Sequence, residues 1–389
     1  MDILPLAQTP AASVVVPSLG RRASLVRVLS ALARQQAPQG AFEVVVVCDG
    51  DRDGSAAACR ALAPTLPYDL RILEQDTQGP ASARNRGVHA ANGELIVFLD
   101  DDVLPDPTLV ATHLAAHADQ RQLASIGPLL PPTDLALSLW GGWEERMLCR
   151  QYDDMVAGRW KATYRQFYTG NAAVRKDQIL AAGGFDPSFK RAEDVELALR
   201  LSEQGTKFVF LPQARGWHYV QRSFQAWLRV PAAYGAADVA MARVDRPRIL
   251  VTAAKEFRTR RLPVRFLTWF CVGRRVTPPT VLLLGAVIRL ADRWRLRSVS
   301  DPLCSIIFNI EYYSGLASAL GGRESFMRLL RNPRAGIGFK FEQDRDQGRQ
   351  SIPYTPSPLH EITDPEAIHG KPTSYRSGPL DGGGSRRSV

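Results

Sequence analysis

Residues 12 to 100 alternate short apolar segments with amphipathic ones, and this alternation constrains the fold more than any other feature of the chain. The apolar segments are rich in β-branched residues, as buried strands are, and lie at 12–18, 42–50, 70–75 and 94–100. The segments between them carry apolar residues at helical spacing and lie at 22–35, 54–63 and 81–91. Apolar strands separated by amphipathic helices predict a parallel sheet covered by helices on both faces.

The alternation weakens after residue 103 and returns with a predicted helix at 193–205 and a predicted strand at 207–212. Beyond residue 223 the pattern becomes helical, aromatic and basic, and beyond 341 it is rich in Pro, Gly and Ser with little periodicity. The expected parts of the chain are therefore a lead at 1–12, an α/β domain at 13–222, a helical region at 223–340 and a disordered tail at 341–389.

The positive charge of the chain is concentrated in one stretch. The whole chain has 49 Lys and Arg and 39 Asp and Glu, a net charge of +10. Residues 243 to 297 hold 14 of the basic residues and 3 of the acidic ones, which accounts for the whole excess. A local basic block indicates one anionic surface, either phospholipid headgroups or nucleic acid.

The cysteines and the apolar segments indicate the cellular compartment in which we expect the protein. The five cysteines are odd in number and widely spaced, so they predict neither a disulfide framework nor a zinc site and suit a reducing cytoplasm. The N-terminus lacks the basic and apolar regions of a signal peptide. The longest apolar run of the C-terminal half, at 281–288, is far shorter than the roughly 20 residues that span a bilayer. We therefore expect no transmembrane helix, whereas a helix lying in the membrane interface stays open.

Three adjacent aspartates follow the strand predicted at 94–100. Like charges disfavour one another's ionised form. We therefore expect a cation or hydrogen-bond donors to stabilise Asp100, Asp101 and Asp102. In an extended segment Asp100 and Asp102 would share a face, and such a pair suits Mg²⁺ or Mn²⁺ held together with substrate phosphates. The alternative is a turn in which the aspartates, with Asp106, cap the next helix. The position at a strand's carboxyl end, where such sheets bind ligands, favours the metal site.

Five segments carry a resemblance to a known family. They are VVVPS, VVVVCDGDRDGS, GPASARNRGVHAANGELIVFLDDD, TGNAAVRKDQILAAGGFD and EDVELALRL. In this order and at these separations they resemble the family 2 glycosyltransferases of the GT-A fold, over about residues 13–222. The resemblance implies a Rossmann-like, mostly parallel α/β sheet flanked by helices, and an inverting enzyme that uses a nucleotide-sugar. The last third of the chain carries no comparably specific signal.

The resemblance also implies where the sugar donor binds. In similar enzymes an aspartate at the end of the second strand contacts uracil or its equivalent, which gives that role to Asp49, with a turn residue as the alternative. Cys48 stands where the family often has a second aspartate, so the identity of the base stays open. Arg84 resembles the family's arginine near the diphosphate, and it lies in a helix whose N-terminus suits phosphate oxygens. The expected donor-binding residues are Pro17, Ser18, Asp49, Arg84, Asp100 and Asp101.

The catalytic and metal-binding residues follow in the same way. In similar enzymes the aspartate of the E-D pair is the general base, which implies this role for Asp194, with Glu193 supporting it or binding the acceptor. Acidic residues at a helix start also simply favour the helix dipole. His218 follows the last predicted strand, where some GT-A enzymes complete the metal shell with a histidine and where a packing role is equally open. The expected metal ligands are Asp100, Asp102 and His218.

Together these residues predict a metal-dependent inverting glycosyltransferase that uses Mg²⁺ or Mn²⁺. The donor would be a nucleotide-diphospho-sugar, with a UDP-sugar favoured, and the acceptor a saccharide or a lipid-linked hydroxyl. Residues 243 to 297 would contact the inner face of the cell membrane peripherally, or pack on the catalytic domain. Nucleic acid is not expected as a partner.

Two other functions remain as alternatives. A nucleotidyltransferase that makes a nucleotide-sugar could use similar acidic ligands, although the first strand is not followed by a Gly-rich loop with a lysine. A non-catalytic protein could bind nucleic acid or another anionic surface through residues 243 to 297, with an affinity that falls steeply with salt.

Overall fold

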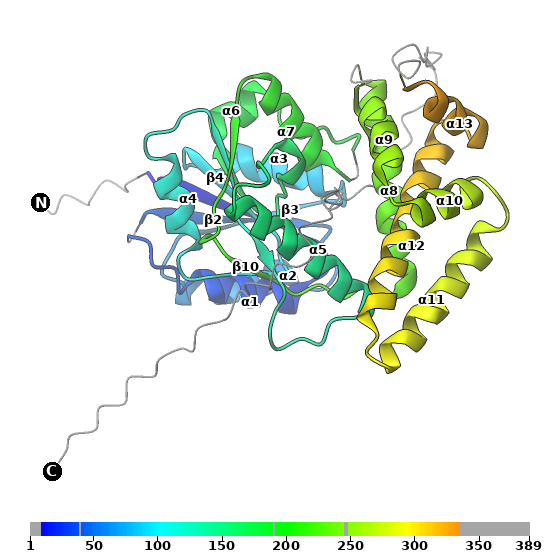
Figure 1. Cartoon of the computed structure of the whole chain (residues 1–389). Helices are drawn as coiled ribbons and strands as arrows, with labels where there is room; N and C mark the ends of the chain where they lie inside the picture. Colours follow the sequence, from blue (N-terminus) through cyan, green and yellow to red (C-terminus); the bar gives the residue numbers. More distant parts are fainter. Residues whose placement is uncertain (1–8, 39, 190, 245–247, 334–389) are drawn as a thin grey trace, which may run out of the picture. The chain divides into compact units, whose positions relative to one another are not determined.

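A seven-stranded sheet forms the centre of the α/β part of the chain (Figure 1). The computed structural model describes residues 9–38, 40–189, 191–244 and 248–333, and the tail expected at 341–389 lies outside this range. The strand order is β3-β2-β1-β4-β8-β6-β9, and within it β8 runs antiparallel to both of its neighbours. The strands are β1 (Ala12–Ser18), β2 (Phe42–Asp49), β3 (Leu70–Gln75), β4 (Leu95–Leu99), β6 (Leu123–Ile126), β8 (Asn171–Arg175) and β9 (Lys207–Phe210).

Helices cover both faces of this sheet, as the sequence predicts. Successive residues of β1 enter different cores: Val14 and Val16 pack in one apolar cluster, and Val15 packs in another with β2 residues and α3. This is the period of two that a strand buried on both faces requires. The helices of this part are α1 (Arg22–Leu32), α2 (Ser55–Leu62), α3 (Pro80–Ala90), α4 (Leu109–His117), α6 (Lys176–Ala181) and α7 (Glu193–Glu203), with short 3₁₀ turns at Ala63–Thr65 and Tyr164–Gln166.

A small second sheet and one long helix occupy the stretch in which the sequence pattern weakens. The sheet has the order β5 (Val103–Pro105), β10 (Gly216–His218) and β7 (Leu129–Leu130). Strand β10 pairs antiparallel with β5 and parallel with β7. Helix α5 (Leu139–Val156) follows β7 and contacts both this strand and the helices near the C-terminus. Strands of two or three residues carry too few positions for a sequence pattern to reveal.

The helical region predicted after residue 223 is confirmed. Helices α8 and α12 form its centre, and they approach closely at two glycines: a Cβ atom on Gly235 would lie 2.0 Å from the Tyr312 carbonyl oxygen, and one on Gly315 would lie 1.8 Å from that of Ala232. Within the described residues, no helix is both long and apolar enough to cross a membrane. The helices are α8 (Phe224–Arg243), α9 (Arg248–Thr259), α10 (Leu262–Cys271), α11 (Thr277–Arg293), α12 (Arg297–Ala319) and α13 (Arg323–Arg331).

The helical region shares an apolar core with the α/β part. Trp143 of α5 packs edge-on against Trp227 of α8 and also contacts Phe308 of α12. The same cluster includes Val195 of α7. All the described residues belong to one compact unit. The contacts of α5 and α7 with α8 and α12 therefore hold the helical region against the α/β part.

Candidate active site

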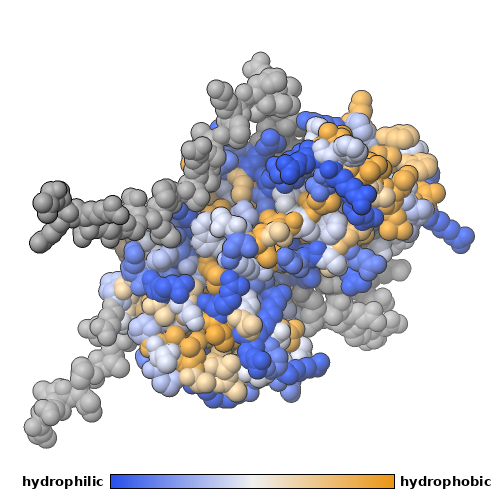
Figure 2. Space-filling model, turned by 90° about the horizontal axis from the view of Figure 1, so that it is seen from below, coloured by the Kyte–Doolittle hydropathy of each residue, from blue (hydrophilic) through white to orange (hydrophobic). Residues whose placement is uncertain are grey.

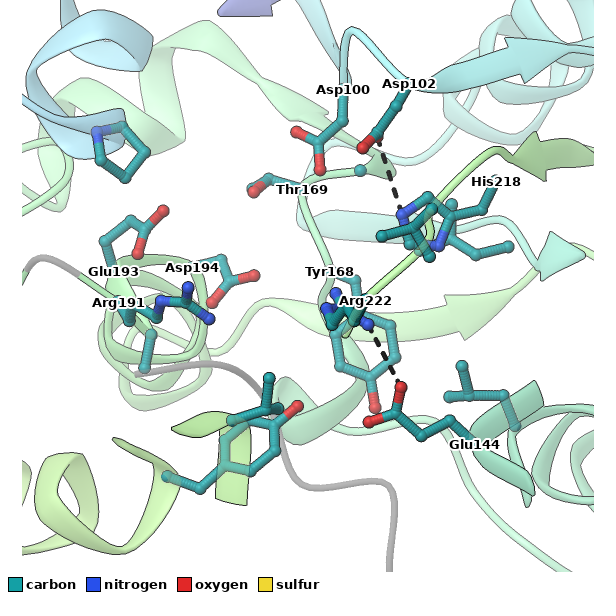
Figure 3. A pocket seen from close by; sticks show the side chains of 18 of the residues that line it. Asp100, Asp102, Glu144, Tyr168, Thr169, Arg191, Glu193, Asp194, His218 and Arg222 are labelled. Atoms are coloured by element: carbon teal, nitrogen blue, oxygen red, sulfur yellow. Dashed lines mark hydrogen bonds and ion pairs between the residues drawn. The ribbon is translucent and has the colours of Figure 1, made fainter. Parts of the chain in front are cut away.

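A cavity of about 480 Å³ lies between the end of β4 and the start of α7 (Figure 3). Its size falls in the range of roughly 300–1,000 Å³ that is usual for small-molecule sites. Asp100 and Asp102 line one side of it, and Glu193 and Asp194 line another. The structure thus brings together the predicted metal motif and the predicted catalytic pair, which are more than ninety residues apart in the sequence.

The three aspartates lie in a turn, so the expectation of an extended segment is wrong. The Val103 amide donates to the Asp100 carbonyl at 3.1 Å, because the chain turns back after β4 to form β5. The division of the side chains is nevertheless the predicted one. Asp100 and Asp102 face the cavity, whereas Asp101 does not line it.

Asp101 and Asp102 are held by residues from the end of β1. The Ser18 hydroxyl donates to Asp101 Oδ2 at 2.6 Å, and Arg21 lies 3.0 Å from Asp101 Oδ1 and 2.5 Å from Asp102 Oδ2. Burial raises the pKa of Asp101 to about 6 against the opposing effects of Ser18 and Arg21. Arg21 was missed by the sequence analysis, although a basic residue three positions after the end of the first strand was a usable signal. The Arg21 side chain is half exposed, so it is accessible to a ligand.

His218 reaches the aspartate turn through the pairing of two short strands. In the antiparallel register of β5 and β10, His218 lies opposite Val103, and the Tyr219 amide donates to the Asp102 carbonyl at 2.8 Å. His218 Nε2 lies 3.6 Å from Asp102 Oδ1 (Figure 3). Burial lowers the pKa of His218. The imidazole is therefore favoured in its neutral form, the form that binds metal ions.

The oxygen and nitrogen atoms at this turn are suitable ligands for a divalent cation, but they do not form a complete coordination site. In the part of the chain that the structure describes, no three His, Cys, Asp or Glu side chains stand close enough together to hold a metal ion by themselves. Two carboxylates and one neutral imidazole around a cavity are ligands that Mn²⁺ accepts, and Mg²⁺ commonly takes one or two carboxylates plus substrate phosphates. The residues present therefore fit a cation that a ligand's phosphates complete.

Arg84 connects the aspartate turn to the acidic pair of α7. Its guanidinium donates to Asp100 Oδ1 at 2.8 Å and to Glu193 Oε1 at 2.6 Å, and only 7% of the side chain is exposed. Gly79, whose φ of +98° favours glycine, directly precedes the helix that carries Arg84, and Pro80 at the first helical position also lines the cavity. Arg84 thus lies in the cavity wall, where an anionic ligand would meet it.

The start of α7 holds two buried carboxyl groups. Ala192, directly before them, has a φ of +60°, which is rare for a residue other than glycine and is a form of strain found at functional sites. Burial, and next the charge of Glu193, raise the pKa of Asp194; burial also raises the pKa of Glu193, against the opposing charge of Arg84. A raised pKa is typical of a cavity carboxyl group that acts as a general base.

The other expected donor-binding residues lie outside this cavity. Asp49 accepts hydrogen bonds from Gln75 Nε2 at 2.9 Å and from the amides of Gln78 at 2.7 Å and Gly79 at 2.8 Å. These bonds use three of the roughly four acceptor positions of a carboxylate. Gln75 and Gln78 in turn line a second surface depression at the ends of β2 and β3. The roles of Asp49, Pro17 and Ser18 toward a nucleoside stay predictions.

The side of the cavity away from the aspartates comes from α5, α8 and the loop after β10, and the sequence analysis missed it. Arg222 pairs with Glu144 at 3.1 Å (Figure 3). Burial, and then the charge of Glu144, raise the pKa of Glu145 to about 8. The available signal was the adjacent pair Glu144 and Glu145, which follows the aromatic start of α5. Polar residues on this side can contact the hydroxyl groups of a second substrate.

The histidines of α4 do not belong to the site. His113 Nδ1 and His117 Nε2 lie 2.8 Å and 2.9 Å from the Ser125 hydroxyl, and both side chains are buried. Burial lowers the pKa of each to about 4. Both histidines therefore pack in the interior of the fold.

Comparisons with known proteins agree with this architecture. The family model described as "Glycosyl transferase family 2" matches residues 13–175, and the one described as "Glycosyl transferase family group 2" matches residues 95–296, more than half of the chain. A solved structure of the mannosyltransferase PcManGT from Pyrobaculum calidifontis, in complex with GDP-Man and Mn²⁺, has a TM-score of 0.51 and 22% identity, covering 79% of this chain and 88% of that one. This likeness supports the predicted GT-A fold.

Curated relatives carry glycosyltransferase names. Validoxylamine A glucosyltransferase of Streptomyces hygroscopicus subsp. jinggangensis (strain 5008) is 32% identical over 220 residues, which cover 50% of this chain and 52% of the relative. Pre-mycofactocin glycosyltransferase of Mycobacterium tuberculosis (strain ATCC 25618 / H37Rv) is 28% identical over 254 residues, covering 61% and 49%. The chain spans about half the length of these relatives. Since a family model covers more than half of the chain, the chain belongs to the family 2 glycosyltransferases.

Proposed function

We propose that the protein is a metal-dependent, inverting glycosyltransferase that moves a sugar from a nucleotide-diphospho-sugar to an acceptor hydroxyl. The observation that carries the proposal is the bridge from Asp100 through Arg84 to Glu193, beside Asp194. This bridge joins the carboxylates that would bind the cation to the residues beside the candidate base, around one cavity. A donor diphosphate beside Asp100 and Arg84 would therefore bring its sugar toward Asp194.

Asp100, Asp102 and His218 are the residues that would hold the cation. A bound Mg²⁺ or Mn²⁺ would supply positive charge to the donor diphosphate and so favour its departure. Arg84 adds a fixed cation in the cavity wall, where it would hold the diphosphate oxygens. Arg21 would leave Asp102 when the cation and the donor bind, because its half-exposed side chain can turn to solvent or to a phosphate.

Asp194 would act as the base of the transfer. It takes the proton of the acceptor hydroxyl while the acceptor oxygen forms a bond to the anomeric carbon. The bond from that carbon to the diphosphate breaks on the opposite face, so the anomeric configuration inverts. Glu193, held by Arg84, keeps the start of α7 in place and raises the pKa of its neighbour.

We propose the donor and the acceptor as chemical classes. We favour a UDP-sugar, and the structural neighbour bound to GDP-Man makes a guanine nucleotide the first alternative to test. The acceptor would be a saccharide or a lipid-linked hydroxyl, since Arg222, Glu144 and Glu145 offer polar contacts on the acceptor side. We place the reaction in the cytoplasm, with the protein in peripheral contact with the inner face of the cell membrane.

The test is turnover of the donor, with water as the acceptor while the natural one is unknown. UDP-glucose, UDP-N-acetylglucosamine and GDP-mannose are incubated with the full chain and Mn²⁺, and proton NMR follows the anomeric signals. We expect one donor to give a nucleoside diphosphate and a sugar of inverted configuration, and this reaction to be lost in Asp194→Asn.

The matched control is Asp186→Asn, because Asp186 lies before α7 and its carboxylate accepts from the Ser188 amide outside the cavity. Unchanged turnover in Asp194→Asn would contradict the role of this base. Formation of a nucleotide-sugar and pyrophosphate from a nucleoside triphosphate and a sugar phosphate would instead identify a nucleotidyltransferase.

A further inference from the structure

Exposed large apolar side chains of this protein are concentrated on one surface. Among the described residues sixteen such side chains are exposed, and twelve of them fall between residues 262 and 299, on α10, α11, the start of α12 and the turns between these helices. Figure 2 shows hydrophobic side chains gathered on the right-hand side, where Figure 1 places α10 and α11. Scattered single apolar residues are normal on protein surfaces, but a continuous group marks a contact.

Helix α11 is apolar on opposite faces. Val281, Gly285 and Ile288 are buried against the rest of the helical region. The opposite face carries apolar residues spaced by four, three and four positions, all exposed: Leu283, Val287, Leu290 and Trp294. A helix with two apolar faces is stable where both faces meet apolar surroundings. The described part of the chain supplies these surroundings on one face of α11 only.

Helix α10 extends the same kind of surface. Leu262 and Phe266 are 74% and 62% exposed, and Trp269 and Phe270 continue the stripe one turn further on. The Arg274 guanidinium lies 5.5 Å from the ring centres of both Trp269 and Phe270. Aromatic rings next to arginines are typical of segments that lie at the boundary between lipid tails and headgroups.

The charge on this surface is almost entirely positive. Between residues 261 and 299 the chain has eight arginines and one acidic residue, Asp292. Seven of these arginines are exposed, namely Arg261, Arg274, Arg275, Arg289, Arg293, Arg295 and Arg297. A second copy of this chain would bring the same cations against them, and a nucleic acid would leave the apolar stripes uncovered. An anionic lipid surface satisfies both the charges and the apolar side chains.

Helix α9 does not take part, although it lies in the basic block of 243–297. Its apolar residues, among them Leu250 and Phe257, are buried in the core. Arg258 donates to the Leu330 carbonyl at 2.6 Å, and Arg243 donates to the Ala319 carbonyl at 2.7 Å. Part of the basic block therefore serves the packing of the helices, and the contact surface is limited to residues 261–299.

We propose that α10 and α11, with the exposed arginines of residues 261–299, form a surface that inserts into the interface of an anionic phospholipid membrane. Leu283, Phe266 and Trp294 enter the apolar layer, and Arg275 and Arg293 contact lipid phosphates. The inference rests on the proposed function in one respect, because a membrane contact would bring the enzyme to a lipid-linked acceptor. The surface itself is defined without any catalytic residue.

The test is flotation of the full-length protein with vesicles. Vesicles of phosphatidylcholine alone are compared with vesicles that contain phosphatidylglycerol, each at low and high salt. We expect flotation with the anionic vesicles, weakened by salt, and a fall of about tenfold or more in Leu283→Glu and Phe266→Glu. Arg275→Gln with Arg293→Gln should weaken binding to anionic vesicles without changing the folding of the protein.

The matched control is Val156→Glu, since Val156 is an exposed apolar residue at the end of α5, away from this surface. Equal loss in Val156→Glu, equal binding to both kinds of vesicle, or no binding by the folded protein would overturn the proposal. A dimer that dissociates in Leu283→Glu, without vesicle binding, would assign the surface to a second copy. Calorimetric titration of nucleotide into the same variants keeps this result separate from the proposed reaction, because Leu283→Glu should bind nucleotide as the unchanged protein does.

Discussion

The cavity and the surface of α10 and α11 depart from the usual distribution of side chains in opposite directions. In the cavity, charged groups such as Arg84, Glu193 and Asp194 are buried. On the helical surface, large apolar groups such as Leu283 and Trp294 are exposed. Burying a charge is costly unless it is paired, and exposing a continuous apolar group is costly unless something covers it.

The two regions differ in how the protein compensates for this cost. The cavity compensates internally, because Arg84 and Arg21 balance the carboxylates before any ligand arrives. Among the residues that the structure describes, the helical surface has no such internal partner, since its outward residues lie on the far side of α11 from the core. We infer that the cavity is organised in advance for its substrate, whereas the helical surface is completed by its partner.

The largest effect is expected in the cavity, from Asp194→Asn. The variant keeps the shape of the side chain but cannot take a proton, so kcat should fall by about 10²–10⁴-fold. The affinity for the donor should change little, because the contacts proposed for the diphosphate are made by other residues. Steady-state kinetics with the preferred donor give the first value, and calorimetry gives the second. A fall in donor affinity with kcat retained would remove Asp194 from the chemical step.

The next prediction compares how the replacement of two arginines changes the free energy of unfolding. Arg84→Met leaves Asp100 and Glu193 without their buried cation, so the free energy of unfolding should fall by about 3–5 kcal/mol. Arg60→Met removes an ion pair with Glu74 that is about half exposed, and it should cost at most about 1 kcal/mol. Urea titrations followed by circular dichroism measure both. Equal costs would mean that the cavity charges are not organised as the structure indicates.

A third comparison tests the two faces of α11. Ile288 is 1% exposed, so Ile288→Ala should lower the free energy of unfolding by about 2–5 kcal/mol. Leu290 is 57% exposed, and Leu290→Ala should change it by no more than about 0.5 kcal/mol in the absence of lipid. The same urea titrations apply. A large loss from Leu290→Ala would show that part of this protein, or a second copy, already covers the outward face.

The smallest effect is a shift in the pH dependence of transfer. A base must be deprotonated to act, so activity is lost as the pH falls through the pKa of Asp194. Since burial and the charge of Glu193 raise this pKa, the acidic limb should lie above the usual aspartate value of about 3.9. Glu193→Gln removes the like charge and should move the limb to lower pH. A limb that stays in place or moves upward in Glu193→Gln would contradict the coupling of the two carboxyl groups.

The parts of the fold with a strong local pattern could be predicted from the sequence. The predicted strands at 12–18 and 70–75 match β1 and β3, and the predicted helix at 193–205 matches α7 within two residues. The short strands β5, β7 and β10 have no such pattern, because they exist only through pairing with distant segments. The position of His218 beside Asp102 was therefore implied by a family resemblance, and its cause, the pairing of β5 with β10, appears only in the structure.

The candidate site was predictable where side chains follow strands or begin helices. Asp100, Asp102, Arg84 and Asp194 lie at such positions and meet in the cavity. Groups from the middle of α5 and from the loop after β10 were missed, because their function depends on how the helical region packs against the sheet. The basic block of 243–297 was predicted as one surface, but tertiary packing divides it between the core contacts of α9 and the outward surface of α10 and α11.

The most direct test of the central claim is calorimetric titration of UDP and GDP into the full chain, with and without Mn²⁺, in the unchanged protein, in Asp102→Asn and in Asp106→Asn. Asp106 is a suitable control because its carboxylate accepts from Thr108 at the start of α4, outside the cavity. The account predicts that one nucleotide binds only with Mn²⁺, and that Asp102→Asn abolishes this binding while Asp106→Asn retains it. Binding that is the same without Mn²⁺ and in Asp102→Asn, or no binding of either nucleotide to the folded protein, would contradict the account.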